Sequence, residues 1–319
     1  MSPDKTMACK KLLIFGATGL IGKYITQAIV ENKDKFDRIA IFTSQGTVQS
    51  KADQIDALKK QGVDVIVGDV TNSEDVVKAY QDIDTVISAV GRNVIEQQVE
   101  LVRLANESPS VHRFFPSEYG TDIEYAPASA NEIPHQKKLK VRAALREECD
   151  NLDHTYVVTG PYSDLFLGNN ERFKQAGTFD VKNKEAVLVG DENTKISFTT
   201  MRDVGKLVVH AVLHPEASRN KALRVNSFTA TNKEILETFE KKTGGQPWKV
   251  SYTSIEDVKK MEQEAVEAGN PFATLFTLRR IWAEGGTLYE KRDNYLIDAE
   301  DDMDSLEDAV SEAVKAQTG

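Results

Sequence analysis

Cysteine is scarce in this sequence: its 319 residues include only Cys9 and Cys149, with no Cys-x-x-Cys pair and no local histidine partner. We therefore expect neither a disulfide framework nor a bound metal ion. No apolar run approaches the roughly 20 residues that cross a bilayer, and the first ten residues (MSPDKTMACK) lack the apolar core of a signal peptide. These absences predict a soluble, cytoplasmic protein that does not contact a membrane.

An excess of positive charge is also missing, since 40 Lys and Arg face 50 Asp and Glu and the net charge is −10. Most of this charge lies in residues 298–319, which hold eight acids and one base. The rest of the chain is nearly neutral and has no basic stripe, so it carries no electrostatic footprint for nucleic acid. We expect a small-molecule substrate, and a monomer or a homodimer.

The first half of the chain alternates short apolar runs with amphipathic helical stretches. This alternation predicts an α/β protein with a doubly wound parallel sheet of the Rossmann type, covered by helices on both faces. After Gly160 the alternation loosens, which indicates a smaller C-terminal substrate-binding region. We expect a dinucleotide-binding domain over residues 8–160, a smaller region over 161–297 that is interleaved with it, and an acidic tail over 298–319. The expected strands of the first domain are 12–15, 39–43, 63–67, 85–89, 113–116 and 156–159.

Helix boundaries can be predicted from capping residues. Thr71 with Glu74 and Thr231 with Glu234 have the spacing of a capping box, which begins a helix. Asp203 is expected to cap the helix over 204–213.

The sequence from Gly16 to Gly22, GATGLIG, follows the apolar run KKLLIF and precedes an amphipathic stretch. Gly16 and Gly19 would allow a tight turn and a close approach to a pyrophosphate, and Gly22 would allow the helix to pack closely on the strand. The main chain of this segment, Thr18, Leu20 and Ile21 included, would bind the phosphates at the helix N-terminus. With a strand before it and a helix after it, the motif predicts a nicotinamide dinucleotide site.

The end of the second expected strand bears on the choice between NAD and NADP. An NAD site usually has an acid there, which binds the ribose hydroxyls. This strand ends at Thr43 and Ser44 with no acid in reach, and Lys51 is the nearest cation. These residues favour NADP(H), although Lys51 could instead be a solvated helix residue.

Two further strings complete the pattern: VISAVG, which ends in Ala89, Val90 and Gly91, and VHRFFPSEYG, which contains Pro116, Ser117 and Tyr119. Together with GATGLIG they resemble the NmrA-like and isoflavone-reductase-like families, which are atypical short-chain dehydrogenases. The resemblance covers roughly residues 10–170 well and the remainder loosely. It implies that the residues of these strings line the cofactor, and that Lys51 matches a family lysine. Plant members carry an arginine near the position of Thr43, so NADP binding would rest here on Ser44 and Lys51.

The resemblance also implies a catalytic residue. Plant members carry a lysine in a K-x-x-I-R pattern, and Lys138 matches it as acid/base and as a cofactor contact. Lys137 and Lys140 would point about 100° and 200° away on a helix. By spacing alone all three lysines could form a solvated basic face. No tyrosine has a lysine four residues later, so the usual Tyr-x-x-x-Lys pair is absent.

Other candidates are weaker on sequence grounds. His135 lies one helical turn before Lys138 and could be a second proton donor, but a solvent-facing histidine is an equal alternative. In family members the segment after the sixth strand walls the nicotinamide and substrate, which implies a cofactor contact for Tyr162. Aromatic residues at such spacing could equally belong to the core. The expected substrate residues are Tyr119, Tyr162, Phe166, Asn169, Phe272 and Phe276.

The sequence thus predicts an NADPH-dependent reductase of a small aromatic or heterocyclic molecule, with hydride passing to a C=C, C=N or C=O carbon in specialised metabolism. One alternative is a biosynthetic enzyme that couples reduction to ring closure. Another is a non-catalytic NmrA-like regulator that senses the cofactor. Such regulators typically lack the catalytic lysine, so Lys138 argues against this second alternative.

Overall fold

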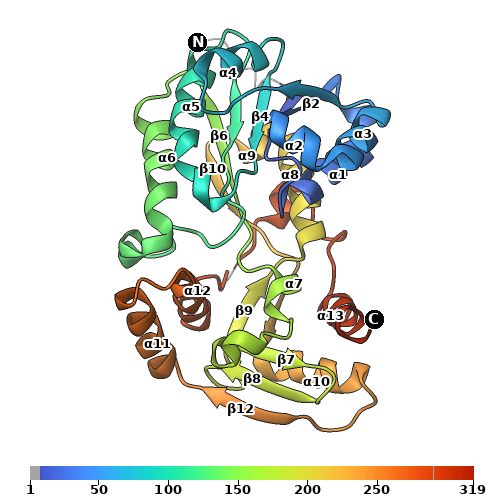
Figure 1. Cartoon of the computed structure of the whole chain (residues 1–319), viewed down its shortest axis with the longest axis vertical. Coiled ribbons are helices and arrows are strands. Elements are labelled where there is room, and N and C mark those ends of the chain that lie inside the picture. The colour runs from blue at the N-terminus through green and yellow to red at the C-terminus, as the bar shows by residue number, and fades with distance from the viewer. Residues whose placement is uncertain (1–7, 290) are drawn as a thin grey trace.

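A seven-stranded parallel sheet and the helices on its two faces form the larger part of the molecule, the large layer (Figure 1). The computed structural model describes residues 8–289 and 291–319. The strands have the order β10-β6-β5-β4-β1-β2-β3, and every neighbouring pair is parallel. The expected α/β class with a doubly wound sheet is therefore confirmed. The strands are β1 (Lys11–Phe15), β2 (Arg38–Thr43), β3 (Asp64–Val67), β4 (Thr85–Ser88), β5 (Arg113–Phe115), β6 (Asp153–Val158) and β10 (Lys221–Arg224).

Helices cover both faces of this sheet because its central strands are apolar on both sides. On one face Ile25, Ile55 and Leu207 belong to one apolar cluster, which joins α1, α3 and α8 to the sheet. On the other face α4, α5 and α6 form a second cluster with the opposite side chains of the strands. The helices of this layer are α1 (Gly22–Glu31), α2 (Gln45–Ser50), α3 (Ala52–Lys60), α4 (Ser73–Ala79), α5 (Gln98–Glu107), α6 (Gln136–Glu147), α8 (Met201–Leu213) and α9 (Pro215–Ser218).

The strand order reverses between β1 and β4, which pair in the middle of the sheet. From β1 the chain proceeds outward to β2 and β3, then crosses back to β4 and proceeds the other way. The two crossovers leave a crevice at the carboxyl ends of β1 and β4, where open α/β sheets bind their ligands. This edge therefore positions the candidate site.

A smaller region lies beyond the carboxyl edge, in the lower half of Figure 1. It contains a three-stranded sheet in the order β12-β8-β7 and a two-stranded sheet of β9 and β11. Its strands are β7 (Thr178–Asp180), β8 (Glu185–Val189), β9 (Lys195–Phe198), β11 (Phe228–Thr231) and β12 (Lys249–Thr253). Its helices are α7 (Ser163–Phe166), α10 (Asn232–Lys242), α11 (Ile255–Glu267), α12 (Ala273–Ala283) and α13 (Leu306–Thr318). Because α8 and β10 return to the large layer, the two parts of the chain are interleaved.

The acidic segment ends in a packed helix. α13 lies against α10 (Figure 1), and Val310 is fully buried in the apolar cluster of the smaller region. Ser305 and Asp308 form a capping box at its start. Residues 306–318 are thus part of the folded structure.

Short 3-10 helices connect several elements of both regions. They are η1 (Lys33–Lys35), η2 (Arg92–Gln97), η3 (Pro127–Asn131), η4 (Ile133–His135), η5 (Glu171–Ala176) and η6 (Asn294–Ile297). Within the described residues, no helix combines the length and the apolar character that a bilayer span requires.

The capping predictions had mixed outcomes. The capping box of Thr231 with Glu234 is confirmed. The prediction for Thr71 is wrong, because Asn72 is the N-cap of α4 and Thr71 bonds Asp69 instead. The prediction for Asp203 is also wrong: Thr200 caps α8 by accepting from the Asp203 main-chain N–H.

Candidate functional site

The glycine turn lies at the carboxyl end of β1 and leads directly into α1. Gly16 has a φ of 73°, in the left-handed region. A Cβ on Gly16 would come within 2.4 Å of the Ala89 carbonyl oxygen, and one on Gly22 within 2.0 Å of the Gly16 oxygen. Both positions therefore require glycine.

The main chain of this turn is available to a ligand. Gly19 donates to the Gly16 oxygen at 2.9 Å, which closes the turn. The N–H groups of Leu20 and Ile21 have no acceptor within the described part of the chain. Free N–H groups at the start of a helix suit a phosphate, so this segment fits the pyrophosphate of a dinucleotide.

Lys51 reaches the glycine turn from the junction of α2 and α3. Its Nζ donates to the main-chain oxygen of Thr18 at 2.5 Å. Ser44 caps α2, with its Oγ accepting from the Thr47 N–H at 3.2 Å, and Thr43 is the buried last residue of β2. The structure thus brings Lys51 and the hydroxyl-bearing end of β2 beside the turn. The Lys51 side chain is exposed to solvent, but its hydrogen bond to Thr18 fixes its position.

The loops after β4 and β5 adjoin the turn. Ala89 contacts it through its carbonyl, and Val90 accepts from the Ser117 Oγ at 3.0 Å. The Gln98 side-chain oxygen accepts a hydrogen bond from the Ser117 N–H at 2.8 Å. Gly91 is the N-cap residue of η2, and Pro116 leads from β5 into its loop. The predicted cofactor residues of these strings therefore gather at the same edge of the sheet.

Lys138 differs sharply from its two neighbouring lysines on α6. Its side chain is only 22% exposed, against 50% for Lys137 and 64% for Lys140, which both pair with Glu96. Its Nζ donates to the main-chain oxygen of Glu118 at 2.8 Å. Burial lowers the pKa of the Lys138 ammonium from its usual value, the Glu118 carboxylate opposes this effect, and neighbouring arginines add to it. The three lysines therefore do not form one solvated face.

A buried ion cluster holds α6 against the loop after β5. Arg142 bonds both oxygens of the Glu118 carboxylate, at 3.0 and 3.1 Å, and also contacts Asp122 and Glu124. The Arg142 and Glu118 side chains are each 1% exposed. Their rigid, bidentate pairing positions the Glu118 main chain and thereby Lys138. Within the described ranges, no group of three His, Cys, Asp or Glu side chains is arranged to hold a metal ion.

His135 is buried at the end of η4, with 2% of its surface exposed. The alternative of a solvent-facing histidine is therefore wrong. Its Nδ1 lies 2.8 Å from the Ser129 carbonyl oxygen, which can only accept, so Nδ1 carries the hydrogen. Burial lowers the pKa of His135 below its usual value, and its Nε2 has no partner among the described residues. A neutral ring of this tautomer offers a lone pair at Nε2, which favours an acceptor over a proton donor.

Tyr119 and Tyr162 meet at the ends of β5 and β6. The Tyr162 hydroxyl donates to the Tyr119 main-chain oxygen. The Tyr119 hydroxyl is buried without a partner in the described part of the chain. Burial raises the pKa of both phenols, so both remain protonated near neutral pH.

The remaining predicted substrate residues fall into two groups. Phe166 is buried against Phe198 and Trp282, and the Trp282 indole N–H bonds the Thr121 hydroxyl at 2.8 Å, beside the loop after β5. Phe272 and Phe276 instead pack on Phe173 in a separate cluster.

Asn169 lies in the loop that precedes η5. Its Oδ1 accepts from the Thr178 hydroxyl at 3.1 Å. The structure thus connects Phe166 to the β5 loop through Trp282, whereas the contacts of Asn169, Phe272 and Phe276 lie within the smaller region.

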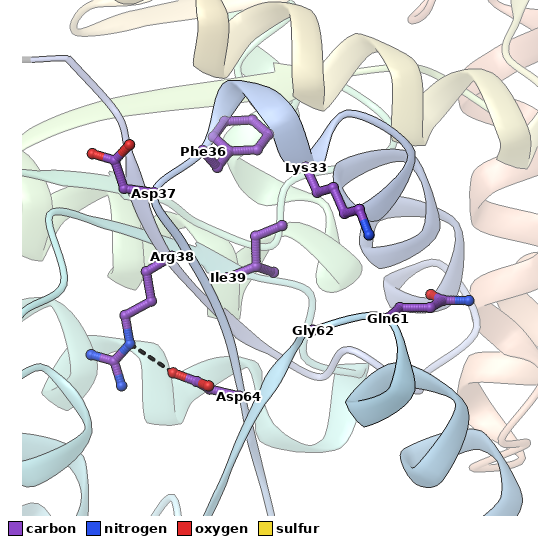
Figure 2. A pocket seen from close by; sticks show the side chains of 8 residues that line it. All are labelled: Lys33, Phe36, Asp37, Arg38, Ile39, Gln61, Gly62 and Asp64. Carbon is purple, nitrogen blue, oxygen red and sulfur yellow. Dashed lines mark hydrogen bonds and ion pairs between the residues drawn. The ribbon is translucent and has the colours of Figure 1, made fainter.

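A hollow of about 370 Å³ lies at the opposite edge of the sheet (Figure 2). It is formed where η1 leads into β2 and α3 leads into β3, and an ion pair of Arg38 with Asp64 at 2.9 Å crosses it. Lys33 also lines it. Since open α/β sheets bind ligands at the carboxyl ends of their strands, this hollow is separate from the candidate site.

Sequence reasoning missed the residues that support Lys138. Glu118 lies within the FFPSEYG string and Arg142 ends the lysine pattern, but nothing in either string shows that they pair. Arg92 after β4 and the buried Arg279 of α12 are two further cations that the sequence patterns do not identify, and neither forms an ion pair within the described residues. Their significance depends on which acids lie near them, and that is known only from the folded structure.

Comparisons with known proteins agree with this architecture. A model of the NmrA-like family matches residues 8–288. Isoflavone reductase of Medicago sativa is 30% identical over 294 residues, covering 88% of this chain and 89% of the relative. An isoflavone reductase homolog of Solanum tuberosum is 33% identical over 260 residues, covering 80% and 81% of the two chains. A crystal structure of isoflavone reductase superimposes with a TM-score of 0.77 at 26% identity, over 97% of this chain and 100% of the other.

A complex of leucoanthocyanidin reductase from Vitis vinifera with NADPH has the same fold, with a TM-score of 0.78 at 22% identity over 96% of this chain and 99% of that one. The seven-stranded sheet with its glycine turn at the switch point defines a Rossmann-like α/β protein. Within that class, the chain belongs to the NmrA-like family and is similar to the isoflavone reductases. The predicted family resemblance is confirmed.

Proposed function

We propose that this protein is an NADPH-dependent reductase of a small aromatic or heterocyclic molecule. The observation that carries the proposal is the position of Lys138: a half-buried ammonium, fixed on the Glu118 main chain, at the edge of the sheet that also holds the glycine turn. A regulator that only senses the cofactor would not need such a group. The names of the relatives, isoflavone reductase and phenylcoumaran benzylic ether reductase, support a reductase.

The cofactor would lie across the carboxyl ends of β1 and β4. The free N–H groups of Leu20 and Ile21 would bind its pyrophosphate. Lys51 and the end of β2, which has no acid, would favour a 2′-phosphate over free ribose hydroxyls. The loops that contain Ala89 and Ser117 would hold the nicotinamide end. When bound, the reduced cofactor supplies a hydride.

Lys138 would supply the proton that balances the hydride, or would orient the polar group of the substrate through a water molecule. Its lowered pKa makes the ammonium a better acid than a solvated lysine. His135 Nε2 and the Tyr119 hydroxyl are unpartnered polar atoms of the same segment and would bind polar groups of the substrate. The hydrogen bond from the Tyr162 hydroxyl to the Tyr119 main-chain oxygen fixes the segments that follow β5 and β6 against each other.

The test is NADPH consumption against a panel of carbonyl, imine and enone substrates, with Lys138→Ala and Lys140→Ala as matched variants on one helix. For a substrate that the wild type reduces, we expect Lys138→Ala to lose about 100-fold or more in kcat, since general acid catalysis contributes 10²–10⁴-fold. Lys140→Ala should remain near the wild-type rate, because Lys140 is exposed and pairs with Glu96.

A full rate in Lys138→Ala would show that Lys138 is not the acid. Products should be identified, because a cyclised product would favour the alternative in which reduction is coupled to ring closure. Tight NADPH binding without turnover of any substrate would favour the regulator.

A further inference from the structure

A cluster of charged side chains adjoins Lys138 and joins α6, the loop after β5 and the end of β10. Within the described residues it pairs three carboxylates with three guanidinium groups, which belong to Glu118, Asp122, Glu124, Arg142, Arg146 and Arg224. The three negative charges balance the three positive charges. Lys138 lies at the edge of this neutral cluster and is not needed to balance it.

Arg142 is the central cation of the cluster. It donates to both oxygens of the Glu118 carboxylate, at 3.0 and 3.1 Å, and also to Asp122 at 3.4 Å and Glu124 at 2.6 Å. The Arg142 and Glu118 side chains are both buried. In the part of the chain that the structure describes, no second guanidinium binds Glu118, so the charge of this carboxylate is neutralised by Arg142.

The two outer carboxylates have further partners. Arg224 lies 3.0 Å from Asp122, and Arg146 lies 2.7 Å from Glu124. Loss of Arg142 would therefore leave Asp122 and Glu124 paired. Glu118 would lose its guanidinium.

Glu118 offers its two kinds of acceptor to different cations. The Lys138 Nζ donates to the Glu118 main-chain oxygen at 2.8 Å. The nearer carboxylate oxygen lies 3.9 Å from the same Nζ, which is beyond hydrogen-bond distance. Arg142 binds that carboxylate in the bidentate geometry that guanidinium groups favour. Lys138 thus lies beside a carboxylate that another cation already neutralises.

The charged and ionisable groups around Lys138 come from four segments: Glu118 from the loop after β5, Arg142 from α6, Arg92 from η2 and His135 from η4. Burial is the main cause that lowers the pKa of Lys138. The Glu118 charge opposes this effect, and the charges of Arg142 and Arg92 add to it. A carboxylate at 3.9 Å without its guanidinium would favour the ammonium more strongly and would raise the pKa of Lys138.

Two further charged side chains on elements that contact α6 have partners of their own. Glu96 of η2 is bonded by Lys140 at 2.5 Å and lies 3.7 Å from Lys137. Arg103 of α5 bonds Glu148 at 2.6 Å. The third such element, η3, has the sequence PASAN and carries no ionisable side chain. Glu118 is therefore the acid whose pairing bears most directly on Lys138.

We infer that Arg142 is a positioning residue for the proposed acid: by holding the Glu118 carboxylate, it leaves the Lys138 ammonium on a carbonyl oxygen and able to transfer its proton. A carboxylate paired with the ammonium would hold the proton more strongly, so transfer to a substrate would be less favourable. The inference rests on the proposed function, in which Lys138 is the acid. Arg142 acts through Glu118 and not on the substrate.

The protonation of Lys138 can be measured without a substrate. Trace labelling with acetic anhydride from about pH 6 to about pH 11, followed by mass spectrometry of the peptides, gives the pH midpoint at which each lysine becomes reactive. The variants are Arg142→Gln, the double variant Glu118→Gln/Arg142→Gln, and Arg146→Gln. The last is the matched control, because Arg146 lies one turn further along α6, is 45% exposed and bonds Glu124.

We expect the Lys138 midpoint to rise by about one pH unit or more in Arg142→Gln, because the released Glu118 carboxylate is a close opposite charge. The double variant removes the carboxylate together with its cation, so its midpoint should differ from wild type by less than about one pH unit. Arg146→Gln should match wild type, since Glu118 keeps its partner. A merely structural role of Arg142 would destabilise Arg142→Gln without raising the midpoint.

A folded Arg142→Gln protein with an unchanged Lys138 midpoint would overturn the inference, and so would a midpoint raised equally in the single and the double variant. If Arg142→Gln does not fold, the double variant decides, because it keeps the charges of the cluster balanced. A fall of its midpoint by about one pH unit or more would show that Glu118 already holds the Lys138 ammonium in the wild type, which would also overturn the inference.

Activity gives a second readout. For a substrate that the wild type reduces, the loss of kcat on the alkaline side should move to higher pH in Arg142→Gln, in step with the midpoint, because the acid must be protonated to act. Failure of the proposed function is distinguished by Lys138→Ala: full activity of that variant would refute the acid role of Lys138, whereas the labelling midpoints do not depend on turnover.

Discussion

Gly22 shows how one residue joins the glycine turn to its helix. α1 begins there against the main chain of its own turn, and a Cβ would lie 2.0 Å from the Gly16 oxygen and 2.9 Å from its carbon. Both atoms belong to the backbone, so no flexible side chain can move aside. A side chain at position 22 would therefore displace the turn that would bind the phosphates.

We predict that Gly22→Ala disrupts the dinucleotide site. The displaced turn should destabilise the protein by about 1–3 kcal/mol, as overpacking does, and should weaken NADPH binding about tenfold or more. Gly46→Ala is the matched control, because the nearest atom to a Cβ there is 3.9 Å away and Gly46 lies within α2. Urea unfolding and NADPH fluorescence titration of both variants would check this. Similar NADPH affinities in the two variants would contradict it.

The neighbours of Lys138 show what residue patterns can and cannot predict. A motif identified Lys138, and helical spacing separated it from Lys137 and Lys140. The partners that lower its exposure could not be predicted, because Glu118 and Arg142 are 24 residues apart and meet only when α6 packs beside β5. One of the two alternatives for His135, a solvent-facing side chain, is wrong for the same reason. The buried ring of His135 is hydrogen-bonded to the main chain of Ser129 in η3, and a sequence pattern does not show this contact.

The ring of His154 in β6 stacks on the ring of Tyr156, with the ring centres 4.7 Å apart. Burial, together with the Arg146 charge, lowers the pKa of His154 to about 4, whereas in the unfolded chain it is near 6.5. Since the unfolded state takes up the proton first, His154 contributes stability above about pH 6.5 that is lost as the pH falls toward 4, on the order of 2–3 kcal/mol.

The measurement is the free energy of unfolding in urea from about pH 7 to about pH 4, for wild type and His154→Phe, which keeps the stacking on Tyr156. We expect the variant to lose less stability over this range. Parallel curves would show that His154 is not the cause.

At the scale of elements, strands were easier to predict than helix starts. All six strands expected in the first domain are present, with bounds that differ by at most three residues. Their apolar runs are conspicuous because the sheet is buried on both faces. Helix starts depend on single side-chain bonds: Thr71 and Asp203 had suitable chemistry, but Asn72 and Thr200 make the capping bonds.

The acidic C-terminal segment was expected as a tail, yet α13 is a packed element. Its acids lie mostly on exposed positions, while Ala309 and Val310 are buried against the smaller region. Gln317 also accepts a bond from the Val181 main-chain N–H at 3.1 Å. Such a helix is difficult to recognise in a highly charged sequence, because a narrow apolar face is sufficient to dock it.

We predict that Val310→Asp destabilises the protein by about 3 kcal/mol or more, because it places a charge in an apolar cluster. Val77→Asp is the control, since Val77 of α4 is 49% exposed, and its effect should stay within about 0.5 kcal/mol. The change in urea midpoint for the two variants gives the comparison. Equal midpoints would mean that α13 does not contribute to the stability of the fold.

For the whole molecule, the large sheet could be predicted and the arrangement of the smaller region could not. Strand–helix alternation and the glycine turn determine the sheet and its switch point. The smaller region combines segments far apart in the chain, such as β8 with β12 and α10 with α13. Its aromatic residues Phe166 and Phe276 accordingly belong to different clusters, which their spacing in the sequence could not show.

We propose that the carboxyl edge of the sheet binds NADPH. It is tested most directly by fluorescence titration of the wild-type protein with NADPH and with NADH. The end of β2 lacks an acid and Lys51 lies at the turn, so we predict that NADPH binds about tenfold or more tightly than NADH. Equal or tighter binding of NADH, or no binding of either dinucleotide, would contradict this proposal.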